Sequence, residues 1–174
     1  MQASILSTLS DKDLLTDRVA RAIAAARRNN IKVIYVVVSF RPGTPEINKN
    51  NKIFLAAKDR WSGGNPEEMM RIDPALLPND DDIIVTKPRI SAFTGSDLEV
   101  ILRANDIQHI LLTGVATSGV VLSTLREAAD KDYRISVLSD CCADGDEEVH
   151  RVLIVKVFPR QAEVLGVDDW IKDL

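Results

Sequence analysis

Residues 31–40 read Ile-Lys-Val-Ile-Tyr-Val-Val-Val-Ser-Phe, and this run decides the fold class. β-Branched and aromatic side chains favour extended backbone, and nearly continuous hydrophobicity is typical of a strand buried on both faces. Strands of that kind belong to parallel sheets, whose two faces are covered by helices. The run therefore predicts a buried strand in an α/β protein.

Helices and strands alternate on either side of this run. Residues 12–29 carry apolar side chains at helical spacing and end at Asn29-Asn30, a pair that tolerates the left-handed turn after a helix. Further strands are predicted at 82–86, 109–114, 134–139 and 162–165, and further helices at 97–104, 118–130, 146–157 and 167–173. This alternation predicts a three-layer, doubly wound, mostly parallel sheet with helices on both faces.

Two segments depart from the pattern. Residues 41–82 are rich in Pro, Gly, Asn and charges, and they form a long connection of the kind used for lids or partner surfaces. Only Met1 to Ser7 precede the first helix, too few for more than a stub of the opening strand. Either the sheet lacks one strand, or the sequence begins inside a longer one; we expect a truncated first strand.

Composition limits the classes of partner. The 174 residues are 45% hydrophobic, which suits one domain spanning 1–174. A net charge of −4 without a basic stripe argues against nucleic acid as a partner, and the apolar stretches are too short to span a membrane. Cys141 and Cys142 are adjacent and therefore predicted to be free thiols, as in a reducing, cytoplasmic compartment, and no secretory signal is visible.

In doubly wound sheets ligands bind beyond the carboxyl ends of the strands. Residues 113–121, Thr-Gly-Val-Ala-Thr-Ser-Gly-Val-Val, lead from a strand into a helix and so direct unpaired backbone N–H groups at that edge. Val120 and Val121 stand where a P-loop would carry Lys and Ser or Thr, which disfavours nucleoside triphosphates. No Gly-x-Gly-x-x-Gly occurs to suggest a dinucleotide.

Three blocks in order carry a family resemblance. They are Thr-Lys-Pro-Arg-Ile-Ser-Ala-Phe-Thr-Gly-Ser-Asp-Leu at 86–98, Gly-Val-Ala-Thr-Ser-Gly-Val-Val-Leu-Ser-Thr-Leu-Arg-Glu-Ala-Ala at 114–129 and Leu-Ser-Asp-Cys-Cys-Ala-Asp at 138–144. The chain resembles the isochorismatase-like cysteine hydrolases over almost its whole length. This family includes nicotinamidases and other amidohydrolases.

The resemblance implies a catalytic triad of Asp, Lys and Cys. Lys87 matches the lysine, and a cis peptide is expected between Val115 and Ala116, with backbone amides near Ala116 and Thr117 as oxyanion donors. Such a lysine could lower a nucleophile's pKa or orient a substrate. A lysine that merely extends to solvent at a strand end is the alternative.

The other two triad positions depart from the family. Val120 occupies the cysteine position, and the aspartate would fall immediately before Met1. Ser118 and Ser123 have no evident base, and caps or exposed helix positions explain them. The resemblance therefore implies a protein of the hydrolase superfamily that would act on an amide or a vinyl ether. The nucleophilic cysteine of the family is absent from its position, which argues against this hydrolysis. The alternative is a catalytically silent homologue that binds a small carboxylate or a protein partner, and whether the chain is an enzyme stays open.

Remaining candidates concern binding and assembly. Arg41 and Arg89 follow strands and could hold a substrate carboxylate, or they could be surface arginines. His109 and His150 flank different elements, so no metal is expected, and no cofactor is implied. Residues 149–158 are apolar nearly all round, which predicts a homo-oligomer contact, with core burial as the alternative.

Overall fold

The computed structural model describes residues 1–62 and 65–174, and the side chains of residues 59–62 and 66 are outside the description. The described residues form strands that pair only in parallel. The strands are β1 (Ile34–Val38), β2 (Ile83–Lys87), β3 (His109–Val115), β4 (Arg134–Ala143) and β5 (Glu163–Leu165). The parallel α/β fold predicted from residues 31–40 is confirmed.

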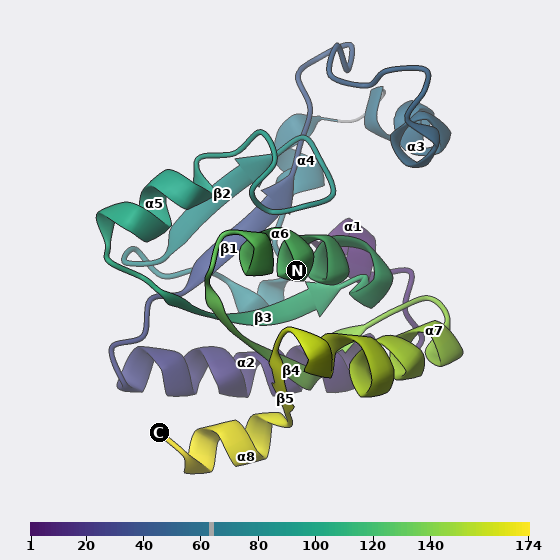
Figure 1. Ribbon diagram of the computed structural model, residues 1–174. Helices are drawn as coiled ribbons and strands as arrows, with labels where there is room; N and C mark the ends of the chain where they lie inside the picture. Colours follow the sequence, from purple (N-terminus) through teal and green to yellow (C-terminus); the bar gives the residue numbers. More distant parts are fainter. Residues whose placement is uncertain (63–64) are drawn as a thin grey trace.

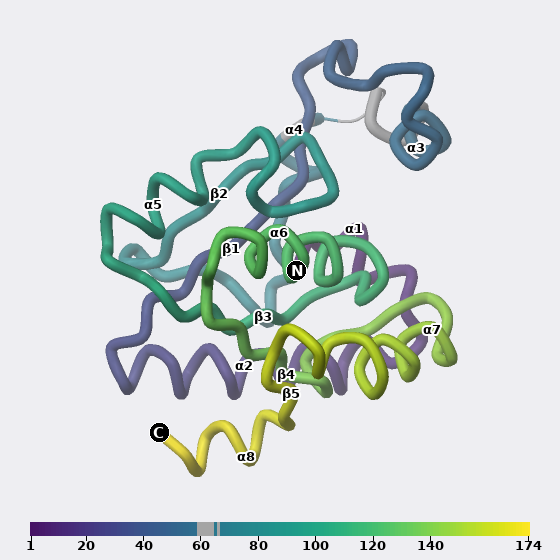
Figure 2. The backbone as a smooth tube through the Cα atoms, in the orientation of Figure 1, coloured from purple at the N-terminus to yellow at the C-terminus, as the bar shows by residue number. Residues whose placement is uncertain are grey.

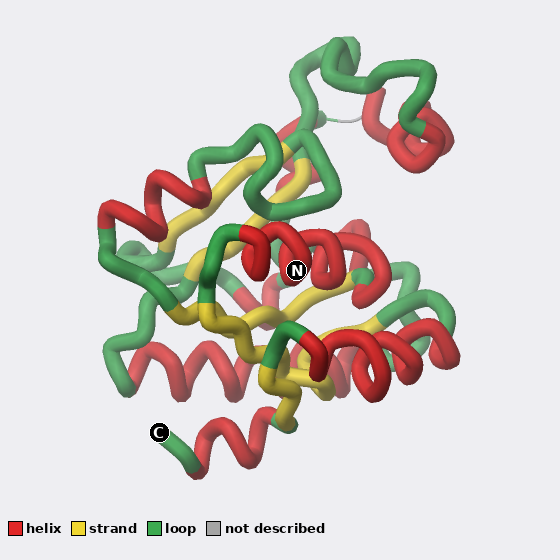
Figure 3. Tube along the Cα trace, in the orientation of Figure 1, coloured by secondary structure: helices red, strands yellow, loops and turns green. Residues whose placement is uncertain are grey.

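Helices lie on both faces of the strands (Figure 1; Figure 3). The α-helices are α1 (Ala3–Leu6), α2 (Lys12–Arg28), α3 (Lys52–Ser62), α4 (Pro66–Met70), α5 (Leu98–Ala104), α6 (Leu122–Asp130), α7 (Glu147–Val152) and α8 (Val167–Lys172). Tighter or wider helical turns are η1 (Pro74–Leu76), η2 (Thr117–Val121), η3 (Leu153–Val157) and η4 (Phe158–Arg160). None of the helices described is long and apolar enough to cross a bilayer.

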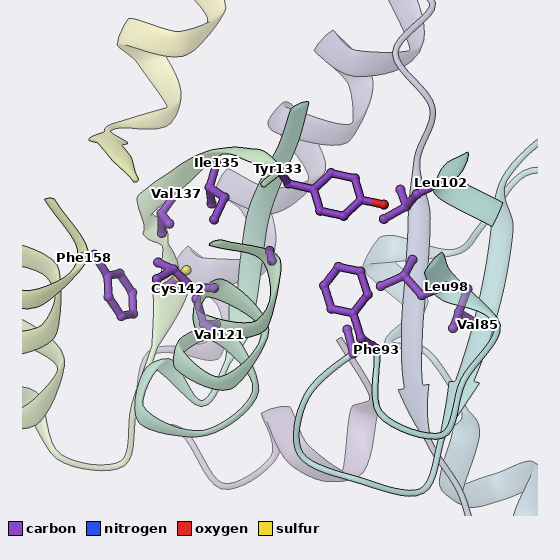
Figure 4. Packing of buried hydrophobic residues seen from close by; sticks show 13 residues of the cluster. Val85, Phe93, Leu98, Leu102, Val121, Tyr133, Ile135, Val137, Cys142 and Phe158 are labelled. Carbon is purple, nitrogen blue, oxygen red and sulfur yellow. The ribbon is translucent and has the colours of Figure 1, made fainter. Parts of the chain in front are cut away.

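The alternation of side chains along β4 divides the core into two clusters. Ile135 and Val137 pack with α5, α6 and Phe158, whereas Leu138 and Cys141 pack with α1, α2 and α8. Successive side chains of a strand point to opposite faces, so each cluster belongs to one face of the sheet. Figure 4 shows the first cluster, where Phe93 and Tyr133 lie with ring centroids 5.8 Å apart. The three-layer arrangement follows from these two buried faces.

The strands form two hydrogen-bonded groups. β1 pairs with β2, and β4 pairs with β3 on one side and β5 on the other. No backbone pairing between β1 and β3 exists in the described part of the chain. Residues 1–7 add no strand, because Gln2 makes only an isolated antiparallel bridge with Ile72 and α1 follows at once. The expected single sheet is therefore interrupted between β1 and β3.

The segment 41–82 contains helical turns that its composition did not predict. The segment leaves the sheet after β1, and its helix α3 lies at the periphery of the molecule (Figure 2). Phe54 of α3 is buried and packs edge-on against Phe40, with ring centroids 5.2 Å apart. Aromatic packing and the Asn caps of α3 and α4 account for the turns that form among these polar residues. The side chain of Trp61, an aromatic residue of this segment, lies outside the described residues.

The core position of α6 generates a stability prediction. Leu125 is fully buried between α6 and the sheet, so Leu125→Ala should lower the free energy of unfolding by about 2–5 kcal/mol in urea denaturation. Val100→Ala on the 71% exposed position of α5 is the control and should change it by less than about 0.5 kcal/mol. Equal effects of the two substitutions would contradict the packing described.

Candidate functional site

The carboxyl ends of three strands meet at one edge of the structure. Lys87 ends β2, and its Cα partner across the ladder is Val38, the last residue of β1. Val115 ends β3, and both Lys87 and Val115 line one cavity of about 300 Å³. The edge predicted to bind ligands therefore carries a cavity, in accord with the rule for doubly wound sheets.

Lys87 is buried with only 5% of its surface exposed. Its Nζ donates hydrogen bonds to the carbonyl oxygens of Ile90, at 2.9 Å, and of Arg89. Burial lowers the pKa of Lys87 to about 8. The alternative of a lysine extended into solvent is thus wrong, because the side chain turns inward and is held by two carbonyls.

The cavity is apolar around Lys87. Val120, Val121 and Ile90 contribute to its wall, and Met1 and Gln2 reach it from the amino terminus. Among the described residues that line it there is no aspartate, glutamate or cysteine. Lys87 and Val120 therefore line the same cavity, and among the described residues no acidic side chain lines it with them.

The turn after β3 has the expected geometry. The peptide bond between Val115 and Ala116 is cis, which confirms the expectation. η2 begins at Thr117, and within the described structure the backbone N–H groups of Ala116 and Thr117 have no hydrogen-bond partner. Such amides, at the start of a helical segment that continues into α6, suit an anionic oxygen.

Two side chains from the neighbouring β4–α7 region fix this turn. Asp144 Oδ2 accepts a hydrogen bond of 2.6 Å from the N–H of Ser118, and Thr117 Oγ1 lies 2.8 Å from His150 Nδ1. Burial raises the pKa of Asp144, but hydrogen bonds from Ser118, Asp146 and Gly145 outweigh it and hold that pKa below its usual value. Ser118 is thereby a fixed part of the turn with its amide already occupied.

The two candidate arginines lie apart from the cavity wall. Arg41 is exposed, and its Nη1 donates to Glu46 Oε1 at 2.6 Å. Arg89 donates from Nη1 to the carbonyl oxygen of Pro88 at 2.7 Å. Neither is among the described residues that line the cavity, so a role in holding a carboxylate stays a prediction.

The cysteines belong to the interior of β4. Cys141 and Cys142 are free and buried, and they pack on opposite faces of the strand. Burial raises the pKa of both thiols, that of Cys142 to about 12. Because the thiolate is the nucleophilic form, these residues act as packed apolar side chains at neutral pH.

The two histidines have hydrogen-bonding roles. His109 Nε2 lies 2.9 Å from Ser136 Oγ, and His150 holds Thr117 on a different element. Within residues 1–62 and 65–174, no group of three His, Cys, Asp or Glu side chains is placed to hold a metal ion.

The roles of three residues of the site were not predicted from the sequence. Gln2 and Phe54 line the cavity, and Asp144 holds the turn. Asp144 follows a predicted strand and ends the third sequence block, so its position was indicated although its role was not. Gln2 and Phe54 carry no local signal, since each reaches the site through contacts distant in sequence.

A family model described as the isochorismatase domain matches residues 1–169. The chain belongs to the isochorismatase family. This confirms the resemblance inferred from the three sequence blocks, and with it the doubly wound fold.

Members of the isochorismatase family include named amidohydrolases. Ureidoacrylate amidohydrolase RutB of Variovorax paradoxus is 32% identical over 170 residues, which cover 88% of this chain and 66% of the relative. RutB of Methylobacterium radiotolerans is 32% identical over 160 residues, covering 80% of this chain and 59% of the relative. The chain thus spans less than two thirds of the length of these relatives.

Solved structures of the isochorismatase family have the same fold. An isochorismatase family protein from Burkholderia thailandensis is 28% identical with a TM-score of 0.78, covering 92% of this chain and 83% of the other. A cysteine hydrolase from Pseudomonas syringae is 23% identical with a TM-score of 0.84, covering 92% and 79%, and shows likeness of fold alone.

The buried lysine predicts a pH-dependent stability. Unfolding returns the pKa of Lys87 from about 8 to its ordinary value of 10.5, so between these pH values the unfolded chain binds more protons. Relative to Lys87→Met, the free energy of unfolding of the unmodified protein should therefore rise by up to about 3 kcal/mol between pH 8 and 10.5, and stay level below pH 8. Denaturation curves across this range measure the difference.

Lys156→Met, at an exposed lysine, provides the control and should show no such rise. If the difference in free energy of unfolding between the unmodified protein and Lys87→Met stays level from pH 7 to 10.5, Lys87 is not desolvated.

Proposed function

We propose that this isochorismatase-family protein binds a small carboxylate-bearing or amide-bearing molecule beside Lys87, and that it does not hydrolyse amides through a thiolate. The observation that carries the proposal is the composition of the cavity. Lys87 and Val120 line it together, without a cysteine or a carboxylate from the described residues. The family resemblance puts the triad lysine at Lys87 and the position of the cysteine at Val120.

The thiolate route is closed at both possible places. Val120 has no nucleophilic atom at the position where the family resemblance puts the cysteine. Cys141 and Cys142 lie within β4, and burial raises the pKa of each thiol. A covalent intermediate on sulfur therefore has no residue on which to form.

The charges favour an anionic ligand. At neutral pH Lys87 is below its pKa of about 8 and carries its proton, yet no acidic side chain described in the cavity neutralises it. Two of its three protons are used on the carbonyls of Arg89 and Ile90, so one is left for a ligand oxygen. The free amides of Ala116 and Thr117 would hold a second oxygen, and Arg41 or Arg89 would have to change partners to join them.

The second candidate is acid-catalysed hydrolysis of an amide or vinyl ether. The named relatives are amidohydrolases, which supports a hydrolytic reaction. The resemblance implies an aspartate as the proton donor of such a reaction.

Exposed apolar side chains and free thiols support a proposal on assembly and compartment. Val155 of η3 is 60% exposed and Val149 of α7 is 37% exposed. Large apolar side chains left open on the surface favour contact with a second copy of the chain. The free thiols fit a cytoplasmic location.

Ligand binding tests the role of Lys87. Calorimetric titration with ureidoacrylate and with benzoate at pH 7 should show binding that Lys87→Met weakens by about 10- to 100-fold, because the substitution removes a buried cationic donor. Lys156→Met should bind as the unmodified protein does. Equal affinity of Lys87→Met and the unmodified protein would exclude Lys87 as the binding group.

Turnover of ureidoacrylate separates ligand binding from hydrolysis as the function of the protein. The 174-residue chain should release no ammonia from ureidoacrylate above the rate without protein. Turnover that survives repeated purification and disappears in Lys87→Ala would contradict the proposal and favour a hydrolase.

A further inference from the structure

Asp144 follows β4 at the level of the turn that follows β3. In the parallel pairing of these strands, their last residues, Val115 and Ala143, are Cα partners. Ala116 and Asp144 are the next residues of the two strands, and Ala116 is one of the residues whose backbone N–H is free in the described structure. The register of the sheet therefore brings the carboxylate of Asp144 to the turn of the candidate site.

The Asp144 carboxylate is held on two sides. Its Oδ2 accepts a hydrogen bond of 2.6 Å from the N–H of Ser118 in η2, and its Oδ1 accepts one of 3.4 Å from the N–H of Asp146. Thr117, which precedes Ser118, is held in turn by His150 of α7 at 2.8 Å. These contacts fix a carboxylate at the amino-terminal end of the helical segment that η2 and α6 form.

This carboxylate is a fixed negative charge at neutral pH. Burial raises the pKa of Asp144, but hydrogen bonds from Ser118, Asp146 and Gly145 outweigh burial and hold that pKa below its usual value. No ion pair of the described residues includes Asp144. The end of the helical segment, which favours negative charge, therefore already carries one anion that no described cation neutralises.

Lys87 provides the opposite charge at a separate place. Burial lowers the pKa of Lys87 to about 8, so its side chain carries a proton at neutral pH. Val115 and Val120, on either side of the free amides, line the cavity of Lys87, whereas Asp144 is not among the described residues that line it. A ligand in this cavity would therefore meet a cation at Lys87 and, at the turn, amides with a carboxylate behind them.

An oxygen bound by the free amides would lie close to that carboxylate. Consecutive Cα atoms are about 3.8 Å apart, so an oxygen on the N–H of Thr117 would lie roughly 4–6 Å from the Asp144 Oδ2 that Ser118 binds. Two full negative charges at this separation repel each other, whereas a carbonyl oxygen carries only a partial charge. Beside Asp144, the amides therefore suit an uncharged carbonyl oxygen better than a second carboxylate.

We propose that Asp144 is a specificity-determining residue, which makes the site select molecules with one carboxylate and one amide carbonyl over dicarboxylates. The carboxylate of such a molecule binds Lys87, and its amide oxygen accepts from the N–H groups of Ala116 and Thr117. Asp144 acts on the ligand through its charge and without direct contact. This inference rests on the proposed function and narrows its ligand class.

Three ligands of similar shape test the role of this charge. Succinate carries two negative charges, its monoamide succinamate carries one, and its diamide succinamide carries none. In calorimetric titrations at pH 7, the unmodified protein should bind succinamate about 10-fold more tightly than either of the others. Asp144→Asn removes the charge but keeps an oxygen for the N–H of Ser118, so it should raise the affinity for succinate about 10-fold and leave that for succinamide unchanged.

Two further variants control for folding and for the net charge of the protein. Asp144→Ser is a second neutral substitution and should shift the ratio of the two affinities, for succinate and for succinamate, in the same direction. Asp173→Asn removes an exposed carboxylate near the end of the chain and should bind all three ligands as the unmodified protein does. Circular dichroism spectra and Tm values show which variants keep the fold.

The outcomes separate this inference from the proposed function. Succinamate binding that depends on Lys87, together with an unchanged ratio in both neutral variants of Asp144, would overturn the role of Asp144 and leave the proposed function standing. Tighter binding of succinate than of succinamate by the unmodified protein, or an equal shift in Asp173→Asn, would overturn it as well. If none of the three ligands binds, or if Lys87→Met binds them equally well, the proposed function fails and this inference fails with it.

Discussion

Parallel strands require each inner edge to find a backbone partner, and this requirement governs the whole structure. β1 has a partner on one side, where it pairs with β2. β3 also has a partner on one side, where it pairs with β4, and β4 pairs with β5 on its other side. On the other side two edges face each other across a cavity, with Gln2 bonded to Val38 at one end. The position of the cavity and the exposure of Thr113 both follow from that one interruption.

The chemistry of the site depends on the same geometry. The carboxyl end of β2 delivers Lys87 to the cavity, where desolvation lowers its pKa, and the turn after β3 adds free amides. Val120 contributes to the apolar wall, and among the described residues that line the cavity Lys87 carries the charged side chain. A family fold does not by itself carry a family activity, because the fold rests on many contacts and the activity on a few atoms.

The sequence predicted those features that depend on neighbouring residues. The apolar run at 31–40 predicted β1, and the glycine-containing turn at 113–121 predicted the amides beside Lys87. Features that depend on distant contacts were not predictable. The Gln2 side chain donates a hydrogen bond to the carbonyl of Val38, 36 residues away in the sequence, and Phe54 of α3 packs against Phe40. Arg41 was predicted from its place after a strand, but Glu46 binds it in an exposed loop, which a strand-end rule does not anticipate.

The most direct test of the account of the site is the titration of the Lys87 side chain, followed by nuclear magnetic resonance of its Cε carbon. Desolvation in the cavity predicts a midpoint near pH 8. A midpoint at the ordinary lysine value of 10.5 would contradict it.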